Sequence, residues 1–164
     1  MAQVIRAPDP LHRDGFSVFL AGSIEMDEAE EWQTRVEGML SETEIVILNP
    51  RRPDWDSSWV QSIDDPQFRE QVEWELAALE KADLIAMYLD PTTKSPVSLL
   101  ELGLFGRSGR MIVCCPQGFW RKGNVDVVCA RYGIEQVDSL DQLVKRVVAA
   151  ADHAARESEE SDER

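Results

Sequence analysis

Several residue types are scarce in this chain of 164 residues. It has 2 histidines, 3 cysteines and only 4 lysines against 13 arginines. The two histidines, His12 and His153, lie near opposite ends of the sequence. Because no other histidine is present, neither a Ser–His triad nor a histidine-based metal site is expected. Acid–base chemistry in this protein therefore falls to carboxyl groups, and we predict no metal and no cofactor.

The three cysteines are Cys114, Cys115 and Cys129, and none of them belongs to a CxxC pair. Their number is odd and no secretory signal is recognisable, so we expect reduced, buried thiols in a cytoplasmic protein. The adjacent Cys114 and Cys115 would point to opposite faces of a strand, which suits neither a disulfide nor a metal site. No apolar run reaches the roughly 18 residues that a membrane span needs.

Basic residues are also fewer than acidic ones. The chain has 17 basic and 31 acidic residues, a formal net charge of −14. Such a surface repels phosphate backbones, which argues against a nucleic-acid polymer or an anionic membrane as partner. Residues 156–164 are especially acidic and are predicted to form a disordered tail. Residues 1–14 carry two prolines and scattered charge and are predicted to be a flexible leader, which leaves residues 15–155 as a single domain.

Within that domain, short apolar runs alternate with helical stripes. Strands are predicted over residues 16–21, 45–48, 84–89, 111–115 and 134–137, and helices over 28–40, 67–81, 97–107, 125–131 and 140–155. The strands are apolar on both faces, which is typical of a parallel sheet that helices cover on both sides. We therefore predict a flavodoxin-like or Rossmann-like doubly wound α/β fold with about five strands. In such sheets ligands bind beyond the carboxyl ends of the strands.

Three segments follow predicted strands and carry candidate binding residues. Gly22 and Ser23 form a turn in which a ligand could approach the backbone, although a plain turn with a helix cap explains them equally well. The long segment after the second strand combines arginines, tryptophans and carboxylates, and the segment after the fourth combines aromatic residues, cations and an amide; both sets suit phosphates and flat rings. Single arginines there are more often loop staples, but the groups as a whole favour binding; the candidates are Asn49, Arg51, Arg52, Asp54, Trp55, Trp120 and Asn124. The phosphate-binding motifs GxGxxG and GxxxxGK[ST] are absent.

Two glutamates stand out because they fall on apolar helix faces. Glu75 lies on the stripe formed by Phe68, Val72 and Leu79, where a carboxylate needs a partner or a catalytic task. Glu101 is the single acid in a helix that is apolar nearly all round and is therefore expected to be buried. A structural salt bridge and a catalytic role are equally plausible for Glu75, and we favour catalysis for Glu101.

Four motifs give the chain a resemblance to the nucleoside 2-deoxyribosyltransferase-like proteins, an α/β superfamily that includes deoxynucleotide N-hydrolases. They are FLAGS, WELAALEKADLI, SPVSLLELG and the pair LNPRRPDWD and CPQGFWRKGNV, which begin at residues 19, 74, 95, 48 and 115. The resemblance covers roughly residues 16–137. It implies cleavage or transfer of the N-glycosidic bond of a nucleoside or nucleotide, without a cofactor, by a protein that forms homodimers or larger homo-oligomers.

The resemblance also implies residue roles. The family's nucleophilic glutamate, which attacks the anomeric carbon of the sugar, matches Glu101, and its acidic residue on the preceding helix matches Glu75. The Gly-Ser turn that contacts the sugar or its phosphate matches Gly22 and Ser23. The remaining motif positions that we assign to substrate binding are Phe19, Trp74 and Ser98.

Two departures from the family pattern define an alternative. Deoxyribosyltransferases carry a tyrosine at the position of Phe19 and an aspartate at the position of Ser95. The loss of both groups favours a nucleotide-binding module with reduced catalysis as the second hypothesis. A partner-binding protein that uses its acidic surface is the third.

Overall fold

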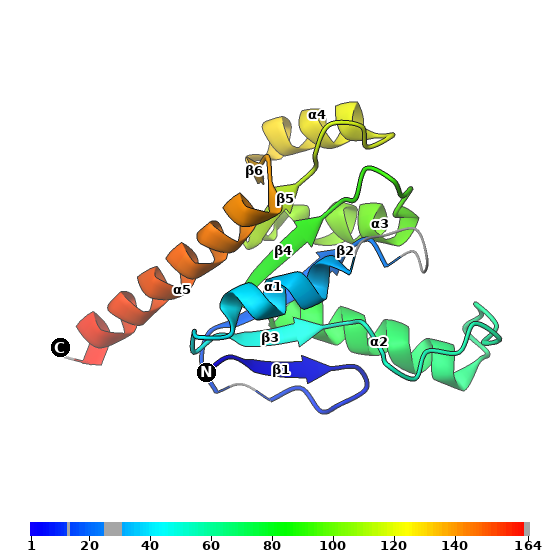
Figure 1. The fold of residues 1–164 in the computed structure, drawn as a ribbon, viewed down its shortest axis with the longest axis horizontal. Helices are drawn as coiled ribbons and strands as arrows, with labels where there is room; N and C mark the ends of the chain where they lie inside the picture. Colours follow the sequence, from blue (N-terminus) through cyan, green and yellow to red (C-terminus); the bar gives the residue numbers. More distant parts are fainter. Residues whose placement is uncertain (13, 25–30, 163–164) are drawn as a thin grey trace.

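The computed structural model describes residues 1–12, 14–24 and 31–162. Within them the chain forms six strands, five α-helices and one short 3₁₀ helix, η1 (Figure 1). In chain order these are β1 (Gln3–Arg6), β2 (Ser17–Gly22), α1 (Trp32–Leu40), β3 (Val46–Asn49), α2 (Pro66–Lys81), β4 (Leu84–Tyr88), α3 (Pro96–Phe105), η1 (Gly106–Ser108), β5 (Met111–Cys114), α4 (Lys122–Tyr132), β6 (Glu135–Val137) and α5 (Leu140–Asp162). The predicted helix over 28–40 begins outside the described residues.

The six strands form one parallel sheet in the order β1-β3-β2-β4-β5-β6. From β3 to β6 this is the strand order of flavodoxin, in which the chain first winds to one side of β2 and then to the other. The predicted doubly wound α/β fold is confirmed, with six strands instead of about five. The reversal of direction places β2 and β4 side by side at the switch point where such sheets bind ligands.

Helices cover both faces of the sheet, because alternate residues of each buried strand pack into different cores. One core contains Phe19, Ile85 and Val113 together with residues of α2, α3 and α4. The other contains Leu20 and Ile47 together with residues of α1 and α5. Every residue of β2 is buried, which explains why its sequence is apolar without alternation.

The adjacent cysteines follow this two-faced pattern. Cys114 packs in the core beneath α1 and α5, and Cys115 packs in the core beneath α2, α3 and α4. Cys114, Cys115 and Cys129 are all buried and free of disulfides, as predicted. Among the described residues, no helix is both long and apolar enough to cross a membrane.

Both chain ends differ from the prediction. In the expected leader, residues 3–6 form the edge strand β1, which pairs with β3 in the register Gln3↔Val46. In the expected disordered tail, α5 continues to Asp162, and its last turns project beyond the sheet (Figure 1). The sequence has no glycine or proline after Gly133, so nothing interrupts the helix. Contacts between residues four apart, such as His153 with Glu157 at 3.4 Å, join successive turns.

Helix α3 is also not buried all round, contrary to the prediction. Its inner face, with Ser98, Glu101 and Leu102, is buried against the sheet. Its outer face exposes Val97 and Leu100, which are 58% and 62% accessible, and Leu104 one turn further along. Composition cannot separate a buried apolar helix from one that offers an apolar face at the surface.

Candidate active site

The turn after β2 brings the backbone of two strands into close contact. Gly22 has φ 134° and pairs with Tyr88 of β4. A Cβ atom on Gly22 would overlap the carbonyl group of Tyr88, so only glycine fits here. The next amide, that of Ser23, donates to the same carbonyl at 3.1 Å. The turn therefore places the Ser23 side chain at the switch point, beside the segment that follows β4.

Three buried hydroxyl groups meet at this point. The Oγ of Ser23 lies 2.9 Å from Thr93 Oγ1 and 2.5 Å from Ser95 Oγ, and the last two atoms are 2.7 Å apart. The amide of Asp90 donates to Ser23 Oγ at 2.9 Å. Ser95 is the N-cap residue of α3, but it has φ 46° and its hydroxyl bonds to this cluster instead of capping the helix. The cluster thus fixes the start of α3, the helix that carries Glu101.

Glu75 on α2 and Glu101 on α3 lie close enough to influence each other's ionisation. Glu101 is 8% exposed, and burial, together with repulsion from Glu75, raises the pKa of Glu101 to about 8. Burial also raises the pKa of Glu75 to about 7, although a hydrogen bond from Gln71 opposes the rise. Among the described residues, neither carboxyl group forms an ion pair with a lysine, arginine or histidine. Two acids held in this way retain a proton near neutral pH.

Helix α2 begins at a well-defined cap that orients Glu75. Asp65 is the N-cap residue, its carboxylate accepts from the amides of Gln67 and Phe68, and Pro66 occupies the first helical position. The buried face of α2 consists of Gln71, Trp74, Ala78 and Leu79. It is rotated from the predicted stripe, so that the sequence analysis overlooked Gln71.

The predicted binding residues in the segment after β3 have different surroundings. Asn49 is buried and donates to Glu37 at 2.7 Å, while its Oδ1 accepts from the Arg51 amide at 2.9 Å. The Arg51 guanidinium has only a long contact of 3.5 Å to Gln33 and a 4.0 Å approach to Glu31 among the described residues. Arg51 is therefore the predicted arginine that retains donors for a ligand.

Arg52, by contrast, bonds to its own loop and to α2. It donates to Asp54 at 2.7 Å and to Glu70 of α2 at 2.9 Å, and it lies 4.9 Å from the centre of the Trp59 ring. Trp55 packs edge-on against Trp59 with the ring centres 4.9 Å apart. With its side chain only 7% exposed, Arg52 is committed to the protein. The geometry therefore favours a role for Arg52, Asp54 and Trp55 in holding the loop together over the predicted role in ligand binding.

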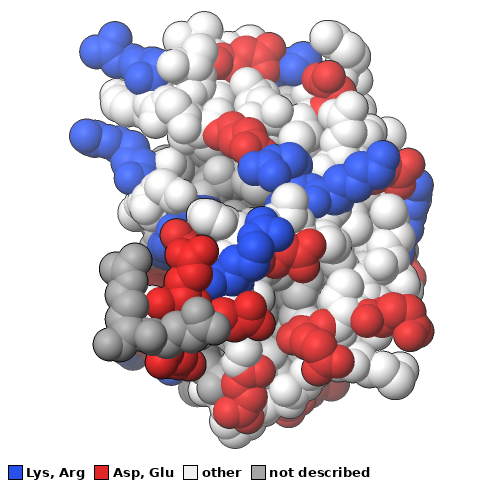
Figure 2. All heavy atoms as spheres, turned by 90° about the vertical axis from the view of Figure 1, so that its left-hand side faces the viewer, with Lys and Arg blue, Asp and Glu red and all other residues white. Residues whose placement is uncertain are grey.

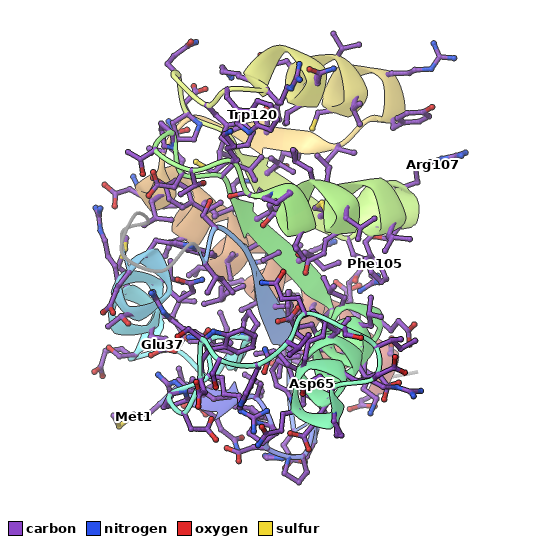
Figure 3. All side chains as sticks on the ribbon, turned by 90° about the vertical axis from the view of Figure 1, so that its right-hand side faces the viewer. Met1, Glu37, Asp65, Phe105, Arg107 and Trp120 are labelled. Atoms are coloured by element: carbon purple, nitrogen blue, oxygen red, sulfur yellow. The ribbon has the colours of Figure 1, made fainter. Side chains whose placement is uncertain are left out.

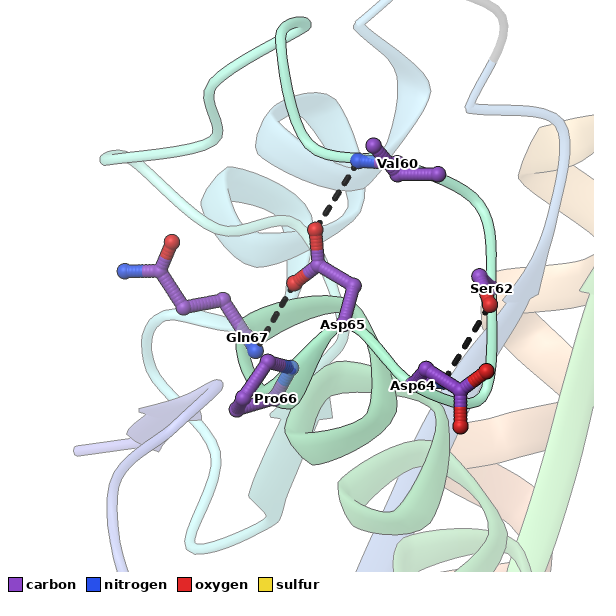
Figure 4. Close-up of a pocket in the computed structure, with 6 residues that line it drawn as sticks. All are labelled: Val60, Ser62, Asp64, Asp65, Pro66 and Gln67. Carbon is purple, nitrogen blue, oxygen red and sulfur yellow. Dashed lines mark hydrogen bonds between the residues drawn. The ribbon is translucent and has the colours of Figure 1, made fainter.

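The same loop borders an open surface hollow of about 630 Å³ (Figure 4). Asp65 lines it and accepts from the Val60 amide at 2.9 Å while capping α2. Six residues of the loop and the first turn of α2 line it, and neither Glu75 nor Glu101 is among them. The hollow therefore reflects the shape of this loop and not the position of the carboxyl pair.

Figure 3 looks onto the carboxyl edge, where Trp120 and Asp65 lie on either side of the strand ends. Trp120 is 49% exposed and donates to the Lys94 carbonyl at 2.8 Å. The Arg121 guanidinium lies 4.4 Å from the ring centre of Trp120. Asn124 is exposed at the start of α4. Trp120 and Asn124 thus remain accessible at this edge, as a ligand-binding role requires.

Other predicted contact residues lie inside the protein. Phe19 has no exposed surface and packs in the core. Trp74 is 8% exposed, and its ring nitrogen donates to the Asp9 carbonyl at 2.8 Å. Both therefore support the site from within instead of contacting a ligand at the surface. Ser98 is buried on the face of α3 that also carries Glu101.

Some residues of the site were missed by the sequence analysis. Asp90 and Thr93 follow β4 directly, and the rule that ligands bind after such strands could have singled them out. Gln71 and Gln33 each have one buried amide atom without a partner in the described structure, Oε1 and Nε2 respectively. Nothing in the local sequence signals these two. No group of three or more potential metal ligands occurs within the described ranges.

The fold and these residues define a class of protein: a flavodoxin-like α/β protein with a buried and a half-buried carboxyl group and a hydroxyl cluster near the switch point. The comparison with known families is more specific. Residues 15–119 match the family described as nucleoside 2-deoxyribosyltransferase like, so the chain belongs to this family. Membership supports the processing of nucleosides in general. No curated protein matches the sequence significantly.

Among solved structures, the fold is similar to that of a conserved protein from Enterococcus faecalis V583. The TM-score is 0.57 at 13% sequence identity, and the match covers 83% of this chain and 99% of the other. At this identity the similarity concerns the fold alone.

Proposed function

We propose that this protein cleaves or transfers the N-glycosidic bond of a nucleoside or nucleotide, with Glu101 as the nucleophile. The observation that carries the proposal is the pair of the buried Glu101 on α3 and the half-buried Glu75 on α2, which has no cationic partner in the described structure. Keeping two acids in this setting costs stability, and such a cost is typical of catalytic sites.

In the proposed reaction the ionised Glu101 attacks the anomeric carbon of the sugar. A carbon–oxygen bond to Glu101 forms while the carbon–nitrogen bond breaks, and the electron pair leaves with the base. Glu75 in its protonated form supplies the proton that the departing base accepts. Water or a second base then attacks the same carbon, releases Glu101 and returns a proton to Glu75.

The substrate class follows from the accessible groups. Arg51 offers guanidinium donors that suit a phosphate or another anionic group of the ligand. Trp120 and Asn124 offer a flat ring and an amide at the same edge, which suit a nucleobase. We therefore favour a phosphorylated or otherwise anionic nucleoside over a free one.

A second candidate, a nucleotide-binding module with reduced catalysis, is favoured by Phe19 and Ser95. Phe19 lacks a hydroxyl group, and the Ser95 hydroxyl bonds to Ser23 and Thr93. This alternative predicts binding of nucleotides without release of free base, even over long incubation. Detection of released base by chromatography would eliminate it.

The decisive test is the replacement Glu101→Gln, assayed with a panel of nucleosides and nucleotides. We expect the variant to fold and to release base at least 10²-fold more slowly than the unmodified protein, because an amide is a far poorer nucleophile than a carboxylate. Glu80→Gln, at an exposed position of α2, is the matched control and should retain full activity. Turnover by Glu101→Gln at the original rate would refute the nucleophile.

Two further properties belong to this proposal. The exposed stripe of α3 supports a homodimer or larger homo-oligomer, because an apolar face on the proposed catalytic helix is suited to burial against a second copy.

The free, buried cysteines support a cytoplasmic location, where thiols stay reduced.

A further inference from the structure

The side chain of Gln71 joins the carboxyl pair to the loop after β3. Gln71 is 5% exposed, and its Nε2 atom donates both to Glu75 Oε1 at 2.7 Å and to the Pro50 carbonyl at 2.8 Å. Pro50 is buried and directly follows Asn49, the last residue of β3, so its carbonyl lies at the edge of the sheet. Gln71 thus connects the backbone at the edge of the sheet with one oxygen of Glu75.

The Pro50 carbonyl determines which way the Gln71 amide faces. A backbone carbonyl is an acceptor only, so the amide nitrogen, and not the amide oxygen, must lie against it. The second hydrogen of that nitrogen is then directed to Glu75. The Gln71 Oε1 atom has no partner within the described structure, so nothing there favours the flipped amide. Glu75 therefore always meets a donor at this oxygen.

A fixed donor stabilises a carboxylate more than a carboxylic acid, since hydrogen bonds to charged groups are the stronger ones. Glu101 receives no comparable bond from a described residue. The other acids of α2 near Glu75 are exposed and paired, Glu70 with Arg52 and Glu73 with Arg69. Of the two carboxyl groups, only that of Glu75 therefore accepts a hydrogen bond from the Gln71 amide.

We propose that Gln71 is a positioning residue that decides where the negative charge of the carboxyl pair lies, holding Glu75 as the carboxylate and leaving the proton on Glu101. This arrangement is the resting state of the ligand-free protein. The reactive state needs the opposite arrangement, with Glu101 ionised and Glu75 protonated. Gln71 therefore sets how much of the protein is ready to react at a given pH, an assignment that rests on the proposed roles of Glu101 and Glu75.

The first experiment titrates the ligand-free protein and requires no turnover. Carbon-13 spectra of the glutamate carboxyl groups are recorded from pH 5 to 10 for the unmodified protein and for Gln71→Met, which preserves side-chain volume. We expect Glu75 to ionise before Glu101 in the unmodified protein. In Gln71→Met the pKa of Glu75 should rise by about one pH unit and that of Glu101 should fall, because the proton moves to Glu75. Gln67→Met, an exposed change one turn earlier, should leave both unchanged.

Unchanged titration of both carboxyl groups in Gln71→Met, or ionisation of Glu101 first in the unmodified protein, would overturn the proposal. If Gln71→Met does not fold, the side-chain amide signals of Gln71 in the unmodified protein answer the same question. They should shift with the ionisation of Glu75 and lose that shift in Glu75→Gln. Amide signals that do not respond to pH would contradict the assignment.

The second experiment measures the pH dependence of kcat/KM for base release, which reports ionisation in the free enzyme. In Gln71→Met the acid limb should move to higher pH and the plateau should rise, because the pair then loses its first proton less easily and more of the singly ionised protein carries its charge on Glu101. A purely structural role would lower the rate without moving the limb. If the proposed reaction is wrong, neither protein releases base. If only the role of Gln71 is wrong, both proteins release base and the acid limb lies at the same pH in both.

Discussion

At the scale of single residues, the half-buried Glu75 and the buried Glu101 link stability to pH. Their pKa values in the folded protein, about 7 and about 8, lie above 4.5, the ordinary value of a glutamate carboxyl group. Between pH 4.5 and the pKa of each group in the folded protein, the folded protein holds a proton that the unfolded chain has already released. The stability that this provides is complete below pH 4.5 and is lost as the pH rises through 7 and 8.

Glu101→Gln should therefore be more stable than the unmodified protein in alkaline solution, because a neutral amide does not ionise. We expect a gain in the free energy of unfolding of about 1–3 kcal/mol at pH 8.5 and little change at pH 5. Urea denaturation at both values measures it, with the exposed Glu80→Gln as control. A constant difference between Glu101→Gln and the unmodified protein at the two pH values would show that Glu101 does not titrate in this range.

At the scale of elements, two glycines in neighbouring segments have opposite roles. Gly38 lies in α1, where an added Cβ would meet no atom within 4 Å. Gly22 ends β2 in a conformation that favours glycine, and an added Cβ would overlap the Tyr88 backbone. Gly38 costs helix stability, whereas Gly22 permits the close approach of β2 and β4.

Gly38→Ala should accordingly raise the free energy of unfolding by about 0.5–1 kcal/mol, because alanine loses less backbone entropy in a helix. Gly22→Ala should lower it by more than about 2 kcal/mol, since both strain and overlap oppose it. Denaturant unfolding of the two variants side by side measures both effects. Equal stability of Gly22→Ala and the unmodified protein would contradict the close contact at the switch point.

At the scale of the whole molecule, charge and apolar surface are distributed unevenly. The end seen from the left of Figure 1, where the strands begin, mixes acidic and basic side chains without a large patch of one sign (Figure 2). At the carboxyl edge, by contrast, Arg51, Lys94 and Arg121 surround the site although the chain carries a net charge of −14. The exposed apolar stripe of α3 lies on the helix that carries Glu101.

If that stripe is covered by a second copy, Leu100→Glu should convert an oligomer into a monomer, because a charge would be buried in the contact. Sedimentation velocity at several protein concentrations measures the change. Met39→Glu is the matched control, since Met39 is 41% exposed on α1, which covers the opposite face of the sheet. A monomer in the unmodified protein at all concentrations, or an unchanged oligomer in Leu100→Glu, would rule out this interface.

The sequence by itself determined the class of fold, because burial of strands on both faces leaves an apolar pattern that is visible locally, as in residues 17–22 and 84–88. It also indicated Glu75 and Glu101, since a carboxylate on an apolar helix face conflicts with its local surroundings. It did not reveal β1, whose four residues carry too short a pattern. It also could not distinguish Arg51 from Arg52, which are chemically identical.

Tertiary structure decided those points. Arg52 is paired because Glu70 lies 18 residues away in the sequence but 2.9 Å away in space, whereas Arg51 has only the long contacts to Gln33 at 3.5 Å and Glu31 at 4.0 Å among the described residues. The orientation of the Gln71 amide depends on the Pro50 carbonyl, 21 residues earlier, to which it donates. Contacts between distant residues depend on how the elements pack, and a local pattern contains no information about that packing.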